Sequence, residues 1–476
     1  MKNLEKEITP WRDSSFKALI PFVVFIIFYF GFSVFTRDFS KVPMTVAFII
    51  SSATALILNH KEKLSKKIEI FAHGMGNRDI MIMCLVFILA GAFSMTAKAV
   101  GCVDAVVNIS QHFIPVRFMI SGLFVVSALI SLSIGTSCGT IAAVVPIAIG
   151  LSQSLGLNPP TVIAAAVSGA MLGDNLSLIS DTTIASTRTQ NVEMRDKMLY
   201  NLRIIIIPAL LCAILYTCPC FYPDTLNMVA TSIDLTSIIK VVPYALLLVL
   251  GILGINVMFL LLIGIILNIA IGIHYGIFDI FQAFTYVGDG TSSMATTIIV
   301  AMLAGGLLIM VRYNGGFNFI INQTGRWIKN KKTCELGISF LIGVTNLFTA
   351  NNTVAIIASG SIVKELSKKY GVDPKRTASI LDTTSCCVQG MIPYGAQILI
   401  ATSLSSSIGV SSFEIIHSLY YPFLIGAGLY ISILFSKSSI TGETSKEAKL
   451  VCLFPFALKG EIRTNLCTPF SAFAYP

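Results

Sequence analysis

The sequence predicts an all-α polytopic membrane protein of about 10–12 membrane segments, with inverted-topology repeats, re-entrant hairpins and discontinuous helices. Composition is the first observation: 55% of the 476 residues are hydrophobic and only 12% are charged, far fewer than in a soluble protein of this length. The apolar residues also gather in runs long enough to cross a bilayer. Finally, two parts of the chain resemble each other, and the basic residues of their loops lie at opposite ends.

The N-terminal region, residues 1–78, predicts two membrane helices. The first apolar run, 18–35, follows a charged stretch and has no small-residue cleavage site after it, so we expect a retained helix and not a signal peptide. Basic residues gather before this run and again in the loop 59–78. Because cytoplasmic loops collect Lys and Arg, both segments are predicted to lie in the cytoplasm, and the net charge of +9 concerns orientation and not nucleic acid.

The repeat covers most of the remaining chain. Three pairs of segments match in the same order: 85–110 resembles 300–325, where a shift of 214 pairs Ala90 with Ala304, 136–143 matches 349–356 at 213, and 156–177 matches 371–392 at 215. Three colinear matches at nearly one shift indicate a duplication. We expect the first repeat over 79–187 and the second over 294–402.

The loop charges predict that the two copies have opposite orientations. The middle loop of the first copy, 152–160, has no charged residue, whereas its counterpart 364–376 has five basic ones. The end of the first copy has four basic residues, whereas the end of the second, 403–412, has none. Inverted copies need an odd number of crossings between them, and connecting helices in 188–293 supply three.

The C-terminal part contains one more helix, in 403–436, and a tail, 437–476. The tail has three prolines and no helical period, so we expect a poorly ordered extension and assign it no function. The charge pattern places both termini in the cytoplasm.

The centre of the first copy contains two carboxylates in an apolar segment, 161–187. A charge at a helix centre costs roughly 2.5–3.5 kcal/mol on insertion scales, so Asp174 and Asp181 are candidate functional residues. If this segment is one helix, Ser177 lies on the same face as both acids. Two glycines, Gly169 and Gly173, are expected to loosen the helix. The alternative for Asp181 is that it lies near the cytoplasmic end and meets water.

The centre of the second copy, 377–402, has one charge, Asp382. The other polar candidates near it are Thr383 and Gln389, and the alignment pairs Gln389 with Asp174. The glycines and the proline that follow in GMIPYG predict a discontinuous helix. An interfacial role for Asp382, or an ion pair with Arg376, is the alternative.

Each copy also has a polar break after an apolar run, and we call these two breaks the tips. We favour re-entrant hairpins over two short full crossings, because the flanking loops of each break lie on one side. The tips offer hydroxyl and amide oxygens, which Na⁺ prefers, from Thr136, Ser137, Asn351, Asn352 and Thr353. Contacts between helices are the alternative role for such side chains.

Two further features leave alternatives open or point to a structural role. Lys98 and Arg312 occupy matched span ends, where snorkelling to the interface and binding of an anionic substrate both fit. The 11 cysteines form no CxxC pair and lie mostly in apolar runs, so we expect small buried side chains and neither a zinc site nor a disulfide framework.

The motifs GTSCGT, GAMLGDNLSLISDTT, NNTVAI and GVDPKRTASILDTTSCCVQGMIPYGAQ resemble the NhaC-type Na⁺/H⁺ antiporter family, within the larger ion-transporter superfamily. The resemblance covers about residues 79–435. It implies inverted repeats, two hairpins and an elevator- or rocking-type carrier. Many relatives have GDHxSPISDTT in the first copy, where this chain has Asn175 and Leu178. The family also includes exchangers of organic acids and amino acids.

We therefore expect a Na⁺/H⁺ antiporter in the cytoplasmic membrane of a prokaryote, in which Asp174 binds a proton in one state and Na⁺ in the other. Candidate site residues around it are Asn175, Ser177, Asp181, Thr182, the two tips, and Asp382, Thr383 and Gln389. The alternative is a Na⁺- or H⁺-coupled carrier of a small carboxylate or amino acid, and a channel is a third class.

The expected partners are the lipid bilayer, Na⁺ and H⁺. We expect no cofactor, no metal beyond the transported Na⁺ and no nucleic acid, and a homodimer stays open. An enzyme is not expected, because no nucleophile–base pair, phosphate loop or metal cluster is evident.

Overall fold

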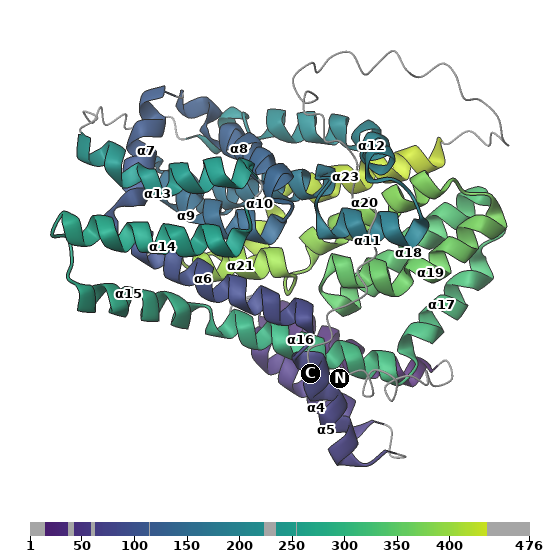
Figure 1. The fold of residues 1–476 in the computed structure, drawn as a ribbon. Coiled ribbons are helices and arrows are strands. Elements are labelled where there is room, and N and C mark those ends of the chain that lie inside the picture. Colours follow the sequence, from purple (N-terminus) through teal and green to yellow (C-terminus); the bar gives the residue numbers. More distant parts are fainter. Residues whose placement is uncertain are drawn as a thin grey trace, which may run out of the picture. The chain divides into compact units, whose positions relative to one another are not determined.

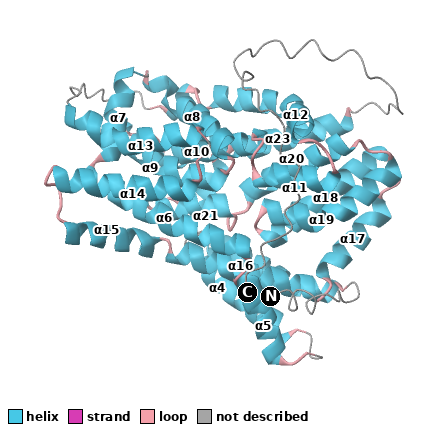
Figure 2. Ribbon diagram, viewed as in Figure 1, coloured by secondary structure: helices cyan, strands magenta, loops and turns pink. Residues whose placement is uncertain are grey.

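The computed structural model describes residues 15–36, 42–58, 62–113, 115–222, 235–253 and 255–435, and these ranges contain helices and no strand (Figure 2). Within them, seven helices are long and apolar enough to cross a membrane, and four shorter apolar helices accompany them. The prediction of an all-helical polytopic membrane protein is confirmed. The tail 437–476 lies outside the described residues.

The described part of the N-terminal region contains short apolar helices followed by an amphipathic one, and the two membrane helices expected there stay a prediction. The first apolar run forms α2 (Ile20–Ile26) and α3 (Phe32–Thr36), joined by a π-helical turn. Next come α4 (Met44–Ile57) and α5 (Leu64–Met75). Helix α5 lies close against α16 of the second copy: a Cβ atom added at Gly74 would lie 2.6 Å from the carbonyl oxygen of Gly305.

The two predicted copies contain the same succession of six helices with similar lengths. The first has α6 (Arg78–Val100), α7 (Cys102–Phe113), α8 (Met119–Ile134), α9 (Ser137–Leu155), α10 (Pro159–Leu176) and α11 (Asp181–Gln190). The second has α16 (Ala295–Tyr313), α17 (Gly316–Trp327), α18 (Lys331–Thr349), α19 (Asn352–Tyr370), α20 (Pro374–Met391) and α21 (Ala396–Leu404). The boundaries 79–187 and 294–402 stay predictions.

The helix starts correct one step of the sequence alignment. Helices α9, α10 and α11 each begin 215 residues before α19, α20 and α21. The shift of 213 proposed for the tips is therefore wrong by two residues, because it ignores where the helices begin. Thr136 corresponds to Asn351, and each is the N-cap residue of its helix. The pairing of Asp174 with Gln389, at 215, agrees with the helix starts.

The two copies face each other through α10 and α20. In Figure 1, α8 and α9 lie toward one end of the described helices, α18 and α19 toward the other, and α10 and α20 meet between them. The turn of each hairpin faces this central region, where both tips line one cavity. Inverted repeats with re-entrant hairpins predict this arrangement.

Four α-helices lie in the described part of the connecting region 188–293, and the three crossings expected there stay a prediction. After α12 (Met194–Leu215), the long apolar run divides into α13 (Leu235–Ile252) and α14 (Val257–His274). Helix α15 (Ile280–Ser293) then runs on into α16 as one apolar stretch of 34 residues. The chain ends its described part with α22 (Ser412–His417) and α23 (Tyr420–Leu434).

The glycines of α10 bring it against α8 and do not loosen it, so that part of the sequence prediction is wrong. A Cβ atom at Gly169 would lie 2.1 Å from the carbonyl oxygen of Phe124, and one at Gly173 would lie 2.2 Å from that of Ala128. Both residues lie inside the continuous helix α10. Backbones that touch leave no room for a side chain, and small residues at such contacts are typical of packing in membranes.

Candidate functional site

The central feature of the site is a break in the helix that contains Asp174. Helix α10 ends at Leu176, residues 177–180 are non-helical, and α11 begins at Asp181. The prediction of a discontinuous helix is confirmed, and the alternative of one helix with Ser177 on the face of both acids is wrong. Because the chain turns at the break, the Ser177 hydroxyl instead donates to the carbonyl oxygen of Leu132 at 2.8 Å.

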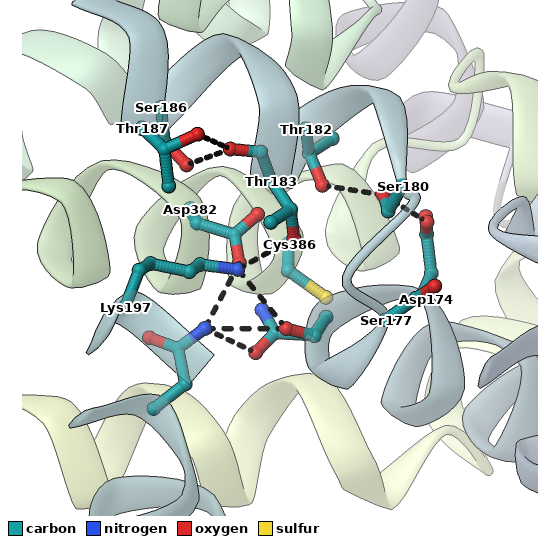
Figure 3. A network of polar contacts seen from close by, with 12 residues as sticks. Asp174, Ser177, Ser180, Thr182, Thr183, Ser186, Thr187, Lys197, Asp382 and Cys386 are labelled. Carbon is teal, nitrogen blue, oxygen red and sulfur yellow. Dashed lines mark hydrogen bonds and ion pairs between the residues drawn. The ribbon is translucent and has the colours of Figure 1, made fainter. Parts of the chain in front are cut away.

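Asp174 accepts hydrogen bonds from neutral hydroxyl groups. Ser137 of the first tip donates to one carboxylate oxygen at 2.8 Å, and Ser180 of the break donates to the other at 2.6 Å. The Ser180 hydroxyl also lies 3.0 Å from that of Thr182, as Figure 3 shows. Asp174 as a whole residue is 9% exposed. Asp174 is therefore held in place without a cation in these contacts.

The first tip is placed against the break by close backbone contact. Gly135, which ends α8, has a φ of 76°, and a Cβ atom there would lie 2.8 Å from a side-chain atom of Ile179 in the break. Only glycine takes this conformation readily and leaves room for the approach. The tip and the break thus form one polar surface around Asp174.

A cavity of about 560 Å³ opens onto this surface. It brings together predicted residues from both copies: Asp174, Asp181, Thr182, Thr136, Ser137, Asn351, Asn352 and Thr353. Asp181 is an exposed residue of its wall, which agrees with the alternative that this acid meets water. Two basic residues, Arg78 and Arg188, also line it. Carboxylate, hydroxyl and amide oxygens therefore surround a space that a hydrated cation can enter.

The second copy supplies amide groups that reach Asp174 through the first tip. Gln389 donates to the main-chain oxygen of Ala350 at 2.8 Å and to the side-chain oxygen of Gln397 at 3.0 Å. Gln397 in turn donates to the Ser137 hydroxyl at 3.0 Å. Sequence reasoning missed Gln397. The corrected shift of 215 would have found it, because Gln397 corresponds to Thr182.

A second polar cluster lies beside the first and contains Asp382. Its carboxylate forms an ion pair with Lys197 of α12 and accepts a hydrogen bond from Asn201 at 3.0 Å. Figure 3 shows the Lys197 ammonium pointing at Asp382, near Thr183. The two ion-paired side chains are 0% and 1% exposed. None of Asn175, Thr383 and Asp382 lines the cavity at Asp174.

The alternative of an ion pair between Asp382 and Arg376 is wrong. Arg376 instead binds Glu335 of α18 with two nitrogen atoms, at 2.7 and 2.8 Å. This geometry suits the planar guanidinium group, which binds a carboxylate through two parallel hydrogen bonds. Arg376 thereby joins the start of α20 to α18, whereas Asp382 pairs with Lys197 of α12.

Sequence reasoning also missed Ser180, Lys197 and Asn201. Lys197 was counted only as a basic residue near the end of the first copy. The available signal is its spacing: Lys197 and Asn201 lie four residues apart, on one face of α12, in a helix whose second half, from Ile204, is apolar.

The remaining candidates lie away from both clusters. Lys98 is exposed and lines a separate cavity of about 200 Å³, and Arg312 is half-buried in the last turn of α16. The choice between snorkelling and anion binding at these residues stays open. Most described cysteines are buried, as expected. In the described ranges, no group of three or more His, Cys, Asp or Glu side chains could hold a metal ion.

Comparison with known proteins finds a family model that matches most of the chain. A family model described as "Na+/H+ antiporter family" matches residues 8–218 and 223–437. The malate-2H⁺/Na⁺-lactate antiporter of Bacillus subtilis is 23% identical over 86% of this chain and 91% of that protein. The Na⁺/H⁺ antiporter NhaC of the same organism is 23% identical over 83% of this chain and 90% of that protein.

One solved structure also matches. The YdaH transporter of Alcanivorax borkumensis covers 73% of this chain and 84% of its own, at 15% identity and a TM-score of 0.40. A likeness this weak carries no argument about the site.

Proposed function

This chain belongs to the Na⁺/H⁺ antiporter family, and from that membership we propose that it exchanges Na⁺ for H⁺ with Asp174 as the carrier group. It is a multi-pass membrane protein of a secondary-transporter family. The observation that carries the proposal is the setting of Asp174: a carboxylate at a helix break, bonded by two hydroxyls and opening onto a polar cavity.

The exchange follows from competition for one carboxylate. A bound cation favours the ionised form of a carboxyl group, and a bound proton removes the charge that holds the cation. With Na⁺ bound, the hydroxyls of Ser137 and Ser180 continue to donate to the carboxylate. Release of Na⁺ on one side of the membrane then allows a proton to bind, and the reverse on the other side completes one exchange.

Oxygen ligands for Na⁺ are available on both sides of Asp174. Thr182 and Asp181 belong to α11, Thr136 belongs to the first tip, and Asn351, Asn352 and Thr353 belong to the second. Ser177 is turned toward α8, so we assign it to holding the break and not to binding the ion. Gln389 acts through Gln397 and Ser137.

The remaining parts of the proposal concern orientation. The charge pattern of the loops supports a cytoplasmic membrane with both termini in the cytoplasm. Discontinuous helices in both copies support an elevator or rocking movement around the cavity.

The test is Na⁺-driven proton movement in proteoliposomes with Asp174→Asn. We expect a loss of at least a hundredfold, because an amide cannot alternate between a charged and a neutral form. Glu69→Gln, which removes an exposed acid from α5, is the matched control and should leave exchange unchanged. Exchange at the wild-type rate in the Asp174 variant would contradict the proposal.

A small carboxylate is the second candidate cargo. Arg78 and Arg188 line the same cavity, whose volume of about 560 Å³ is far larger than a bare Na⁺ needs. Arginine is well suited to bind carboxylates, and one relative is named as a malate-2H⁺/Na⁺-lactate antiporter. This alternative predicts that Na⁺ flux requires malate, lactate or a similar anion on the opposite side. It also predicts that Arg188→Gln abolishes this anion-dependent flux.

A further inference from the structure

We propose that the Lys197 ammonium is a resident cation in a second cation site, and that removing it creates a site that binds Na⁺. The inference deepens the proposed function and rests on it in one respect, that Na⁺ is the ion this chain handles. It assigns Lys197 as a positioning residue, and it assigns Asp382 to this closed site and not to the exchanging one.

The atoms around the ammonium are those that bind a hard cation. Lys197 donates to the hydroxyl of Thr183 at 2.8 Å and to the main-chain oxygen of Asn175 at 3.2 Å, and it is ion-paired with Asp382. A hydroxyl, a carbonyl and a carboxylate are also the kinds of oxygen ligand that Na⁺ takes. The Asn175 carbonyl belongs to the last turn of α10, where carbonyls lack helical partners and the helix dipole is negative.

One more oxygen atom beside these residues lacks a partner. The side-chain oxygen of Asn201 is fully buried and accepts no hydrogen bond in the described structure. The amide nitrogen of Asn201 is meanwhile used, by Asp382 and Asn175. Buried polar atoms normally find partners. An ion small enough to approach all the oxygens would also use the Asn201 oxygen, which the lysine leaves without a partner.

The site joins elements that would otherwise be independent. Asn175 and Thr183 lie on opposite sides of the break in the first copy, Asp382 lies in the middle of α20 in the second, and the lysine comes from α12 (Figure 3). A cation here therefore holds the break against the second copy. Because the lysine is covalently attached and 0% exposed, that cation stays in place while the ion at Asp174 changes.

The experiment follows thermal unfolding of the full purified chain in detergent, with Na⁺ titrated against choline. Lys197→Met keeps an apolar stem and leaves Asp382 without its cation. We expect this variant to gain a Na⁺-dependent rise in Tm of a few degrees, since a ligand that binds only the folded state stabilises it. The double variant Lys197→Met/Asp382→Asn is the matched control and should lack that rise.

The same titration with Asp174→Asn separates this inference from the proposed function. If Asp174→Asn/Lys197→Met shows the Na⁺-dependent rise, the second site binds Na⁺ whatever Asp174 does. If the rise appears but Asp174→Asn alone still exchanges ions, the proposed function fails and the second site stands.

Three outcomes overturn the inference. One is a Tm of Lys197→Met that follows Na⁺ no more than that of the double variant. The same conclusion holds if Lys197→Met is lost from the membrane in both salts while the double variant folds, because Na⁺ then cannot replace the ammonium. In the wild-type chain, a Hill coefficient near 1 for Na⁺ is expected, and a coefficient near 2 would contradict a resident cation.

Discussion

Asp174 and Asp382 are both buried aspartates in broken helices, yet their surroundings differ in one decisive respect. Asp174 is bonded by two neutral hydroxyls and opens onto a cavity. Asp382 is ion-paired with Lys197 and is closed off. A carboxylate can exchange its counter-ion only if that ion can leave. The difference teaches that the number of acids in a membrane segment does not give the number of exchanging sites.

The two acids are also not repeat counterparts. At the shift of 215, Asp174 corresponds to Gln389 and Asp382 corresponds to Val167. Each copy therefore contributes its acid at a different level of the same kind of helix. The asymmetry is chemical, whereas the succession of helices is shared.

The largest expected effect on stability comes from Asp382→Asn. Removing one partner of a buried ion pair leaves the other charge uncompensated, at a cost of about 3–5 kcal/mol. Asp174→Asn should cost less than about 1.5 kcal/mol, because its contacts are hydroxyls that an amide can still bond. Denaturation in detergent, followed by helical circular dichroism, measures both. Equal losses would remove the distinction between the two acids.

The packing of α10 against α8 and that of α20 against α18 should differ next. In Gly173→Ala the new methyl group would lie 2.2 Å from a main-chain oxygen of α8, and we expect a loss of about 1–3 kcal/mol. The matched control is Gly343→Ala in α18, where the nearest atom lies 3.5 Å away, on Val388. That variant should be nearly neutral. The same denaturation assay decides, and a tolerated Gly173→Ala would mean that α10 can move away from α8.

A smaller effect is expected within the exchanging site. Ser180→Ala removes one of the two hydroxyl donors that hold the Asp174 carboxylate in place. We expect the KM for Na⁺ to rise about tenfold with little change in stability. Ser177→Ala, three residues away, loses only a bond to α8 and should leave KM unchanged. Initial rates of exchange over a range of Na⁺ concentrations measure both. If both variants shift KM alike, Ser180 has no special role.

The smallest effect is expected from an exposed ion pair between α12 and α20, the two helices that also form the buried pair of Lys197 and Asp382. Lys375 of α20 and Asp196 of α12 lie 2.8 Å apart and are 48% and 35% exposed. Lys375→Ala should change stability by less than about 1 kcal/mol, because exposed pairs are screened by water and salt. Comparison with Asp382→Asn therefore isolates burial, since Asp196 and Lys197 are neighbours in the chain. A loss above 3 kcal/mol would contradict this account.

Much of the fold could be predicted from the sequence because hydrophobic run length and loop charge are strong, local signals. A break near Asp174 was also predicted from GAMLGDNLSLISDTT, although its glycines pack α10 against α8 and the break lies after them, at 177–180. What the break does to neighbouring side chains was not, since a helical wheel assumes a continuous helix. Ser180 reaches Asp174 and Ser177 does not, for that reason alone.

Long-range pairing was the part that the sequence could not supply. Lys197 and Asp382 are 185 positions apart, and nothing in the sequence of either segment predicts that they form an ion pair. Lys197 was counted with the loop residues because the positions of Lys and Arg in a sequence indicate membrane topology but not which residues they contact. The register of the tips failed for a similar reason: short polar motifs align in more than one way until the helix starts are known.

The series of hydrogen bonds that begins at the amides of the second copy affects how the charge of Asp174 is stabilised. Every donor in it is oriented the same way, from Gln389 to Gln397, then to Ser137, then to the carboxylate. Water around a free ion orients its dipoles likewise, but must rearrange each time the charge changes. Side-chain dipoles held by helices do not. The second copy has no acid at this level, and it serves the first as a fixed hydration shell.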